Sequence, residues 1–174
     1  TLTCVLTSFG LNAINGTSAS PTITYSWTAT NGGNITGGNT TLTPTIDAPG
    51  TYTLLVTDAS NSCTSTETVT VLENIVDPNV DAGSAAPLTC AVLTLPLQAS
   101  STSGNITYLW STTNGTILGG GNTPTPTIGS TGTYTVLVTD NINGCTATDN
   151  IVVTDDVVPP VAAIAQPEIL TCDL

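Results

Sequence analysis

The chain has 174 residues, carries twelve Asp or Glu residues and contains no Lys, Arg, His or Met, so its formal net charge is −12. Without cationic side chains it cannot neutralise phosphates, which argues against binding to nucleic acid or to an anionic membrane surface. Without His or Lys it lacks a histidine base and an amine nucleophile, so we expect no enzymatic activity. No apolar run reaches the roughly 18 residues that span a bilayer, so we expect no membrane insertion.

Short segments of alternating polarity begin the chain. The segment from Leu2 to Leu6 places Leu2, Cys4 and Leu6 on one side, and Phe9 to Ala13 follows by alternation. A third segment places Ile23, Tyr25 and Trp27 on one side. A two-residue period is the pattern of a strand with one buried face. These segments therefore predict three strands, with turns at the Gly- and Asn-containing stretches that separate them.

The clearest strand is Gly50 to Asp58, where Tyr52, Leu54 and Val56 share one parity and threonines share the other. Its sequence, Gly-Thr-Tyr-Thr-Leu-Leu-Val-Thr-Asp, returns almost unchanged at Gly132 to Asp140. Such internal similarity indicates a tandem repeat. The proline in the preceding Thr-Pro-Thr-Ile segment, also present in both copies, predicts an edge strand or a bulge there.

The similarity extends along the whole unit. Trp27 corresponds to Trp110, the last strands are predicted at Glu67 to Leu72 and Asp149 to Thr154, and Ile169 to Cys172 repeats the start of the chain. No segment has helical periodicity. About seven short strands per unit, with frequent turn signals, predict an all-β chain of tandem immunoglobulin-like antiparallel sandwiches.

The strand that contains Trp27 and the strand that contains Tyr52, with their second copies, are predicted to form the core of each sandwich. We expect Trp27 to pack beside Tyr52, and Trp110 beside Tyr134. Tryptophans at this parity could instead be platforms for stacking sugars, but Trp in this strand of a sandwich usually belongs to the core.

Two cysteines recur in each unit, one near its start and one after the Tyr strand. The recurrence predicts disulfides within each unit, Cys4 with Cys63 and Cys90 with Cys145, and leaves Cys172 as the first cysteine of a third copy. Free thiols are the alternative, and a zinc site is not expected because two cysteines without His do not complete a tetrahedral set. Structural disulfides are typical of an oxidising, extracellular setting.

The combination of Leu-Thr-Cys, Tyr-x-Trp, Gly-Thr-Tyr-Thr-x-x-Val-Thr-Asp and Asn-x-Cys-Thr resembles the tandem PKD-like or immunoglobulin-like repeats of large secreted surface proteins of Bacteroidota. An acidic-glycine motif typical of the PKD domain proper is missing after the Trp. In the family a unit begins at a stretch like Pro78 to Gly83. This phasing implies a first repeat at residues 1–77 without its opening strand, a second at 78–159, and the opening strand of a truncated third at 160–174.

The resemblance implies non-enzymatic adhesins, surface stalks and filaments that are exported by the type IX route and often glycosylated. Five Asn-x-Thr sequons are candidate glycosylation sites, and the alternative is bare polar turns. They begin at Asn15, Asn34, Asn39, Asn105 and Asn114.

Carboxylates gather in the two stretches between units. Hard cations such as Ca²⁺ are bound by several carboxylate oxygens, so calcium at these junctions is one hypothesis. The spacing matches no calcium-binding loop, and acidic junctions also keep a surface soluble, so no metal ligand is assigned. The residues concerned are Glu73, Asp77, Asp81, Asp155 and Asp156.

We therefore expect a structural or adhesive repeat of an extracellular fibre or cell-surface adhesin, with neighbouring repeats as head-to-tail partners and surface glycans as candidate ligands. The alternative is a carbohydrate-binding module of a secreted hydrolase, which would need an exposed aromatic row. A third hypothesis, an enzyme with the Asp155 and Asp156 pair, is disfavoured because adjacent residues of a strand project oppositely. Two assemblies remain open at residues 160–174: a covalent array, or donation of this tail to the next subunit.

Overall fold

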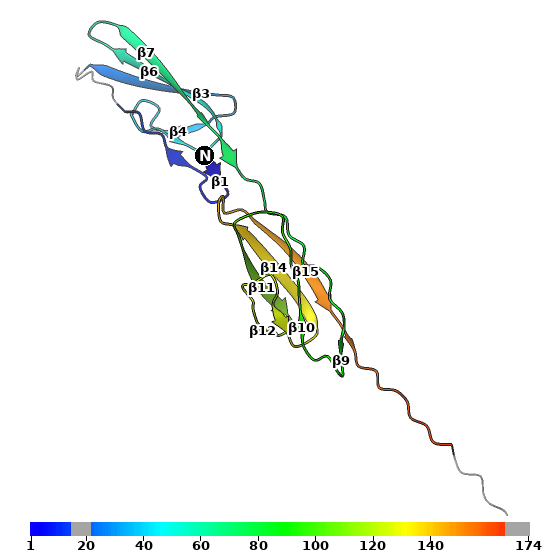
Figure 1. The fold of residues 1–174 in the computed structure, drawn as a ribbon. Coiled ribbons are helices and arrows are strands. Elements are labelled where there is room, and N and C mark those ends of the chain that lie inside the picture. The colour runs from blue at the N-terminus through cyan, green and yellow to red at the C-terminus, as the bar shows by residue number, and fades with distance from the viewer. Residues whose placement is uncertain (15–21, 166–174) are drawn as a thin grey trace, which may run out of the picture.

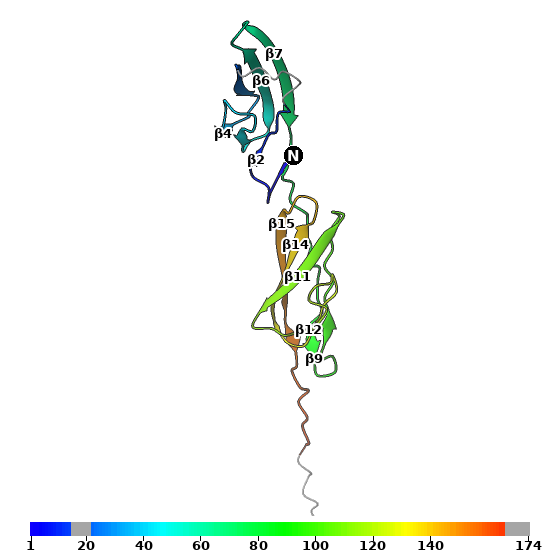
Figure 2. The same ribbon diagram turned by 90° about the vertical axis from the view of Figure 1, so that its left-hand side faces the viewer.

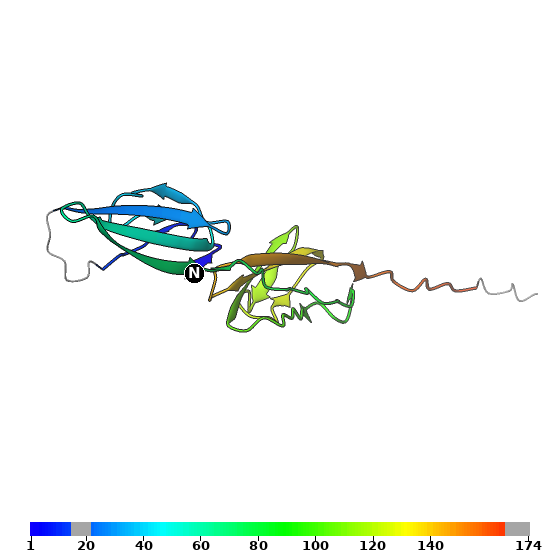
Figure 3. The same ribbon diagram turned by 90° about the horizontal axis from the view of Figure 1, so that it is seen from above.

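The computed structural model describes residues 1–14 and 22–165 and shows two β-sandwiches joined end to end, followed by an extended segment (Figure 1). The views at right angles show the same elongated arrangement (Figures 2 and 3). No stretch of the described chain forms a helix that could cross a membrane.

The first sandwich consists of three small sheets. A three-stranded antiparallel sheet has the order β3-β6-β7, a second has the order β2-β5-β4, and β1 pairs with β8 in parallel. The strand bounds are β1 Leu2–Thr3, β2 Phe9–Gly10, β3 Ile23–Thr30, β4 Ile35–Gly37, β5 Thr45–Ile46, β6 Gly50–Asp58, β7 Cys63–Val71 and β8 Glu73–Asn74.

The second sandwich repeats this topology with the orders β11-β14-β15 and β10-β13-β12 and the parallel pair β16-β9. The repeat seen in the sequence is therefore a repeat of sheet order and register. The strand bounds are β9 Leu88–Thr89, β10 Leu95–Pro96, β11 Ile106–Thr113, β12 Ile117–Gly119, β13 Thr127–Ile128, β14 Gly132–Asp140, β15 Thr146–Val153 and β16 Asp155–Asp156.

Each sandwich has its own hydrophobic core. Trp27 and Tyr52 are buried in the first, and Trp110 and Tyr134 in the second. The Tyr134 hydroxyl donates to Ser130 O at 2.6 Å, as Tyr52 does to the carbonyl four residues before it. A hydrogen bond from this tyrosine to a backbone carbonyl a few residues upstream is typical of immunoglobulin-like sandwiches. It fixes the position of the chain where it enters β6 and β14.

Several predicted strands are shorter in the structure. The segment from Leu2 to Leu6 is a strand only at β1, because Thr3 N–H donates to Leu6 O and the Thr3 hydroxyl accepts from Leu6 N–H, which turns the chain. Likewise β2 ends at Gly10 rather than Ala13. The last strands are longer than predicted, because the hairpins extend β7 and β15 back to Cys63 and Thr146.

The stretch between the sandwiches packs on the second one. Asp81 and Ser100 form an antiparallel bridge, and Ala82, which is 1% exposed, belongs to the second core with Val80 packed against it. The Ala82 amide also donates to Asp149 Oδ2 at 2.8 Å. The second sandwich therefore has an additional edge segment at residues 80–83.

Candidate functional site

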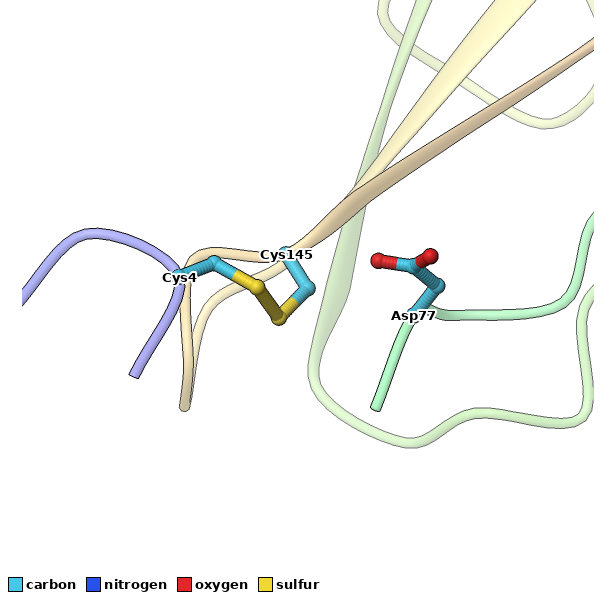
Figure 4. A group of neighbouring side chains, drawn as sticks. All are labelled: Cys4, Asp77 and Cys145. Carbon is cyan, nitrogen blue, oxygen red and sulfur yellow. A yellow bond between two sulfur atoms is a disulfide. The ribbon is translucent and has the colours of Figure 1, made fainter. Parts of the chain in front are cut away.

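A disulfide joins the two sandwiches at their junction. Cys4, in the turn after β1, is bonded to Cys145, which lies immediately before β15 of the second sandwich (Figure 4). Their Cα atoms are 5.1 Å apart, within the usual span of a disulfide. Cys145 is 1% exposed, whereas Cys4 remains exposed. The bond therefore seals the contact between the domains.

The pairing predicted within each unit is wrong. Cys63 and Cys90 are free and exposed, and Cys172 lies outside the described residues. The reason is distance along the sandwich: β7 begins at Cys63, and only its other end continues to β8, which pairs with β1 beside Cys4. Nine residues of strand span about 30 Å, far more than a disulfide can bridge.

Asn143 reinforces the junction. Its side chain is 2% exposed, and its Nδ2 donates to Asn74 Oδ1 at 3.1 Å and to Val76 O at 2.9 Å, both on the chain leaving the first sandwich. Its Oδ1 accepts from Cys145 N–H at 2.9 Å. A buried amide with both groups satisfied fixes the position of one domain on the other. Sequence reasoning missed this residue, whose only signal was the recurrent Asn-x-Cys.

The hairpin between β14 and β15 gives Cys145 its position. Asp140 Oδ1 accepts from Ile142 N–H at 2.7 Å, and Asp140 O accepts from Gly144 N–H at 2.8 Å. Gly144 has a φ of 72°, which glycine adopts without strain. A Cβ at this position would lie 2.5 Å from Val5 Cγ1, so Val5 of the first sandwich packs directly on the glycine.

Asp77 lies beside the disulfide, with its carboxylate facing the two sulfur atoms (Figure 4). Cys4, Asp77 and Cys145 are the one set of three metal-ligand side chains that comes together among the described residues. While the sulfurs are bonded to each other they are not thiolates, the form that binds metals. The junction carboxylates named for calcium, Glu73 and Asp81 included, do not gather with Asp77 into such a set.

The sequons occupy exposed positions in the part of the chain that the structure describes, and Asn15 lies outside it. Asn34 Nδ2 donates to Asp47 Oδ1 at 2.8 Å, so this amide already has a partner. Asn105 and Asn114 adopt positive φ in turns, and Asn39 precedes the turn that leads to β5.

All seven aromatic residues pack against the two cores, including the half-buried Phe9, Tyr25 and Tyr108. An aromatic row on the surface, which a carbohydrate-binding module would need, is therefore not formed.

An apolar groove of about 420 Å³ runs along the first sandwich. It lies between the segment after β2 and the last strand, β7, and Val69 on its wall is 41% exposed. Its lining residues include Leu11, Ala13, Trp27, Leu54, Glu67 and Val69.

No known protein family and no curated protein matches the chain. Among solved structures, it is similar to the three N-terminal domains of the bacteriophage RB49 highly immunogenic outer capsid protein, with 18% identity, a TM-score of 0.45 and coverage of 84% of this chain and 57% of that one. Drosophila N-cadherin EC1-3 gives 12% identity, a TM-score of 0.39, and coverage of 81% and 57%. Murine CEACAM1b is 15% identical, with a TM-score of 0.34 and coverage of 83% of this chain and 89% of that one. The chain thus spans little more than half of the first two, and these weak likenesses do not bear on function.

Proposed function

We propose that this chain is a non-enzymatic structural and adhesive repeat of an extracellular fibre or cell-surface adhesin. The observation that supports the proposal is the disulfide between Cys4 and Cys145, because it joins two independently cored domains rather than closing a loop inside one. A bond in that place contributes stiffness to a row of domains. It also favours an oxidising location outside the cytosol.

The surface composition agrees with this role. Every charged side chain is acidic, so like charges along the fibre repel and limit clumping at neutral pH. The absence of Lys and Arg removes all cleavage sites for trypsin-like proteases. Threonines on the outward faces of the long strands suit an exposed sheet.

The location can be tested with an antibody raised against the purified chain. In immuno-electron microscopy of the producing cells, we expect gold label along extended fibres outside the envelope. Label confined to the cell interior would contradict the proposal.

The stiffness can be tested on the purified chain by small-angle scattering. With the disulfide intact we expect the profile of a single elongated rod, and we expect the paired variant Cys4→Ser with Cys145→Ser to show a broader range of distances between the domains. Identical profiles would show that the bond does not stiffen the junction.

A further inference from the structure

The turn around Cys90, after β9 at the end of the second sandwich away from the junction (Figure 1), repeats the local structure that carries Cys4. Thr89 N–H donates to Val92 O at 3.0 Å, and Val92 N–H donates to Thr89 Oγ1 at 3.0 Å. The turn at Cys4 has the same two hydrogen bonds at the same positions. Cys90 is thus held in a turn already shaped for a disulfide, but its thiol is free and exposed.

The upper end of the first sandwich repeats the hairpin that carries Cys145. Cys63 N–H donates to Asn61 Oδ1 at 2.9 Å, and Ser62 has a φ of 60°, close to the 72° of Gly144. The thiol of Cys63 is free and exposed as well. The far ends of the two sandwiches therefore carry, with free thiols, the two halves of the internal junction.

Side-chain sizes at the two ends are complementary. In the internal junction, Val5 packs against Gly144, which has no Cβ. At the free ends the corresponding residues are Ala91 and Ser62. If these two ends met as the internal junction does, Ser62 on the hairpin would face Ala91, which is smaller than Val5 and would leave room for the added Cβ.

The groove of the first sandwich corresponds to a filled site on the second. There residues 80–83 cover the equivalent surface, and Ile151 is 8% exposed, whereas Val69 at the same position of the first sandwich is 41% exposed. Glu67 stands at the position of Asp149, whose carboxylate accepts from the Ala82 amide. The first sandwich lacks this edge segment among its described residues.

The tail of the chain matches the segment that fills the groove. Residues 160–165 correspond to 78–83, with Pro160 at the position of Pro78, Ala162 at Val80 and Ile164 at Ala82. In residues 78–82 the first, third and fifth positions are less exposed than the other two, and Val80 and Ala82 pack in the second core. Ile164 is 96% exposed in the tail, so the apolar side of this segment is uncovered.

We propose that a second copy of this chain docks head to tail on the first, with its Cys63 disulfide-bonded to Cys90 and its groove filled by residues 160–165 of the first copy. The inference rests on the proposed fibre function and deepens it. In the internal junction, Asn74 Oδ1 and Val76 O accept hydrogen bonds from Asn143. Asp156 and Val158 occupy the corresponding positions after the second sandwich. At the proposed contact they would therefore offer a carboxylate oxygen and a carbonyl oxygen to Asn61 of the second copy. The donated segment is residues 160–165, and the positions that follow it in the repeat are held by Leu2 to Cys4 of the second copy itself.

The covalent step needs an oxidant, and a small-molecule disulfide such as oxidised glutathione supplies it. The Cys90 thiolate attacks one sulfur of that disulfide, forms a mixed disulfide and releases one thiol. The Cys63 thiolate of the second copy then attacks the Cys90 sulfur, forms the new S–S bond and releases the second thiol. Two protein thiols are oxidised and one disulfide is reduced to two thiols.

The test is carried out on the full chain carrying Cys172→Ser, so that this thiol does not compete. Two variants are mixed in a glutathione redox buffer, one with Cys63→Ser and one with Cys90→Ser. Docking predicts that nearly all disulfide dimers contain one chain of each variant. Random collision of two equally reactive thiols gives about half mixed and half self-paired dimers, and that result, or no dimer, would overturn the proposal. The crosslink is mapped with a protease that cuts at Asp and Glu.

The groove contact has a matched pair of variants in the tail. Ile164→Asp places a carboxylate on the apolar side, whereas Ala163→Asp places it on the other side, where Asp81 stands in the filled site. Burying an unpaired carboxylate is unfavourable, so we expect Ile164→Asp to slow formation of the Cys63–Cys90 bond about tenfold and Ala163→Asp to leave it within about twofold. Equal rates for both variants would show that the tail does not fill the groove.

The outcomes separate this inference from the proposed function. A chain that stays monomeric under these conditions, but is found in fibres on cells, retains the proposed function and loses the head-to-tail contact. A chain that forms the Cys63–Cys90 bond, but is found only inside cells, retains the contact and loses the extracellular role.

Discussion

The glycine at the start of each Tyr strand has a steric role. A Cβ on Gly132 would lie 2.8 Å from both Gly115 N and Gly115 Cα, and a Cβ on Gly50 would lie 2.3 Å from Gly33 N. The backbone of the turn after the Trp strand passes directly over this position. The first residue of the repeated Gly-Thr-Tyr-Thr motif is therefore fixed by a close backbone approach rather than by strand preference.

Replacing Gly132 with Ala should destabilise the second sandwich by about 2 kcal/mol, because backbone atoms must shift to admit the new Cβ. The matched control is Gly104→Ala, where a Cβ meets nothing within 4 Å and φ is not positive. Urea unfolding followed by Trp fluorescence measures both variants. Equal free energies of unfolding for the two would contradict the steric explanation.

The individual residues show how far sequence pattern reaches. Alternation placed Trp27, Tyr52, Trp110 and Tyr134 on buried faces, because a two-residue period needs only local information. It could not place Asn143, since a buried amide in a hairpin is recognisable only once the neighbouring domain is in position.

At the scale of elements, the long central strands were predictable and the short edge strands were not. Apolar alternation indicates β3 and β6, whereas β7 is exposed along eight of its nine residues and is expected only from Glu67 onward. The parallel pairs β1-β8 and β9-β16 are two residues long and carry no periodic signal. These pairs decide where Cys4 lies. The disulfide pairing was mispredicted for this reason: recurrence of two cysteines in each unit does not say at which end of the sandwich each one lies.

The two hairpins offer a direct measurement of the junction. The side-chain oxygens of Asn143 and Asn61 each accept a hydrogen bond from the backbone amide two residues later. Asn143 also donates from its Nδ2 to Asn74 and Val76 at the end of the first sandwich. In a background with Cys4→Ser and Cys145→Ser, we expect Asn143→Ala to weaken the contact between the domains by about 1–3 kcal/mol, and Asn61→Ala to leave it unchanged.

The contact can be followed by the distance between two spectroscopic labels, one on each sandwich, as denaturant is increased. The junction should open at a lower denaturant concentration in Asn143→Ala than in Asn61→Ala. Coincident opening in the two variants would show that the cross-domain hydrogen bonds contribute nothing to the junction.

At the scale of the whole molecule, the disulfide changes which part of the chain carries tension. The bond joins positions 141 residues apart, so a force applied at the two ends passes from Cys4 directly to Cys145. From there β15 runs along the second sandwich toward the C-terminal segment (Figure 1). The load therefore follows a strand that is already extended and bypasses most of both cores.

This route predicts the result of pulling single molecules from their ends. With the disulfide intact, the chain should resist without the long extension of domain unfolding, because the residues between the two cysteines lie outside the path of the force. Reduction should release them and add on the order of 500 Å of extended chain. Cys145→Ser should behave as the reduced protein without added reductant, whereas Cys63→Ser, which leaves the internal bond in place, should behave as the oxidised one. If the oxidised chain extends as far as the Cys145→Ser variant, the force does not pass through the disulfide and the bond has no mechanical role.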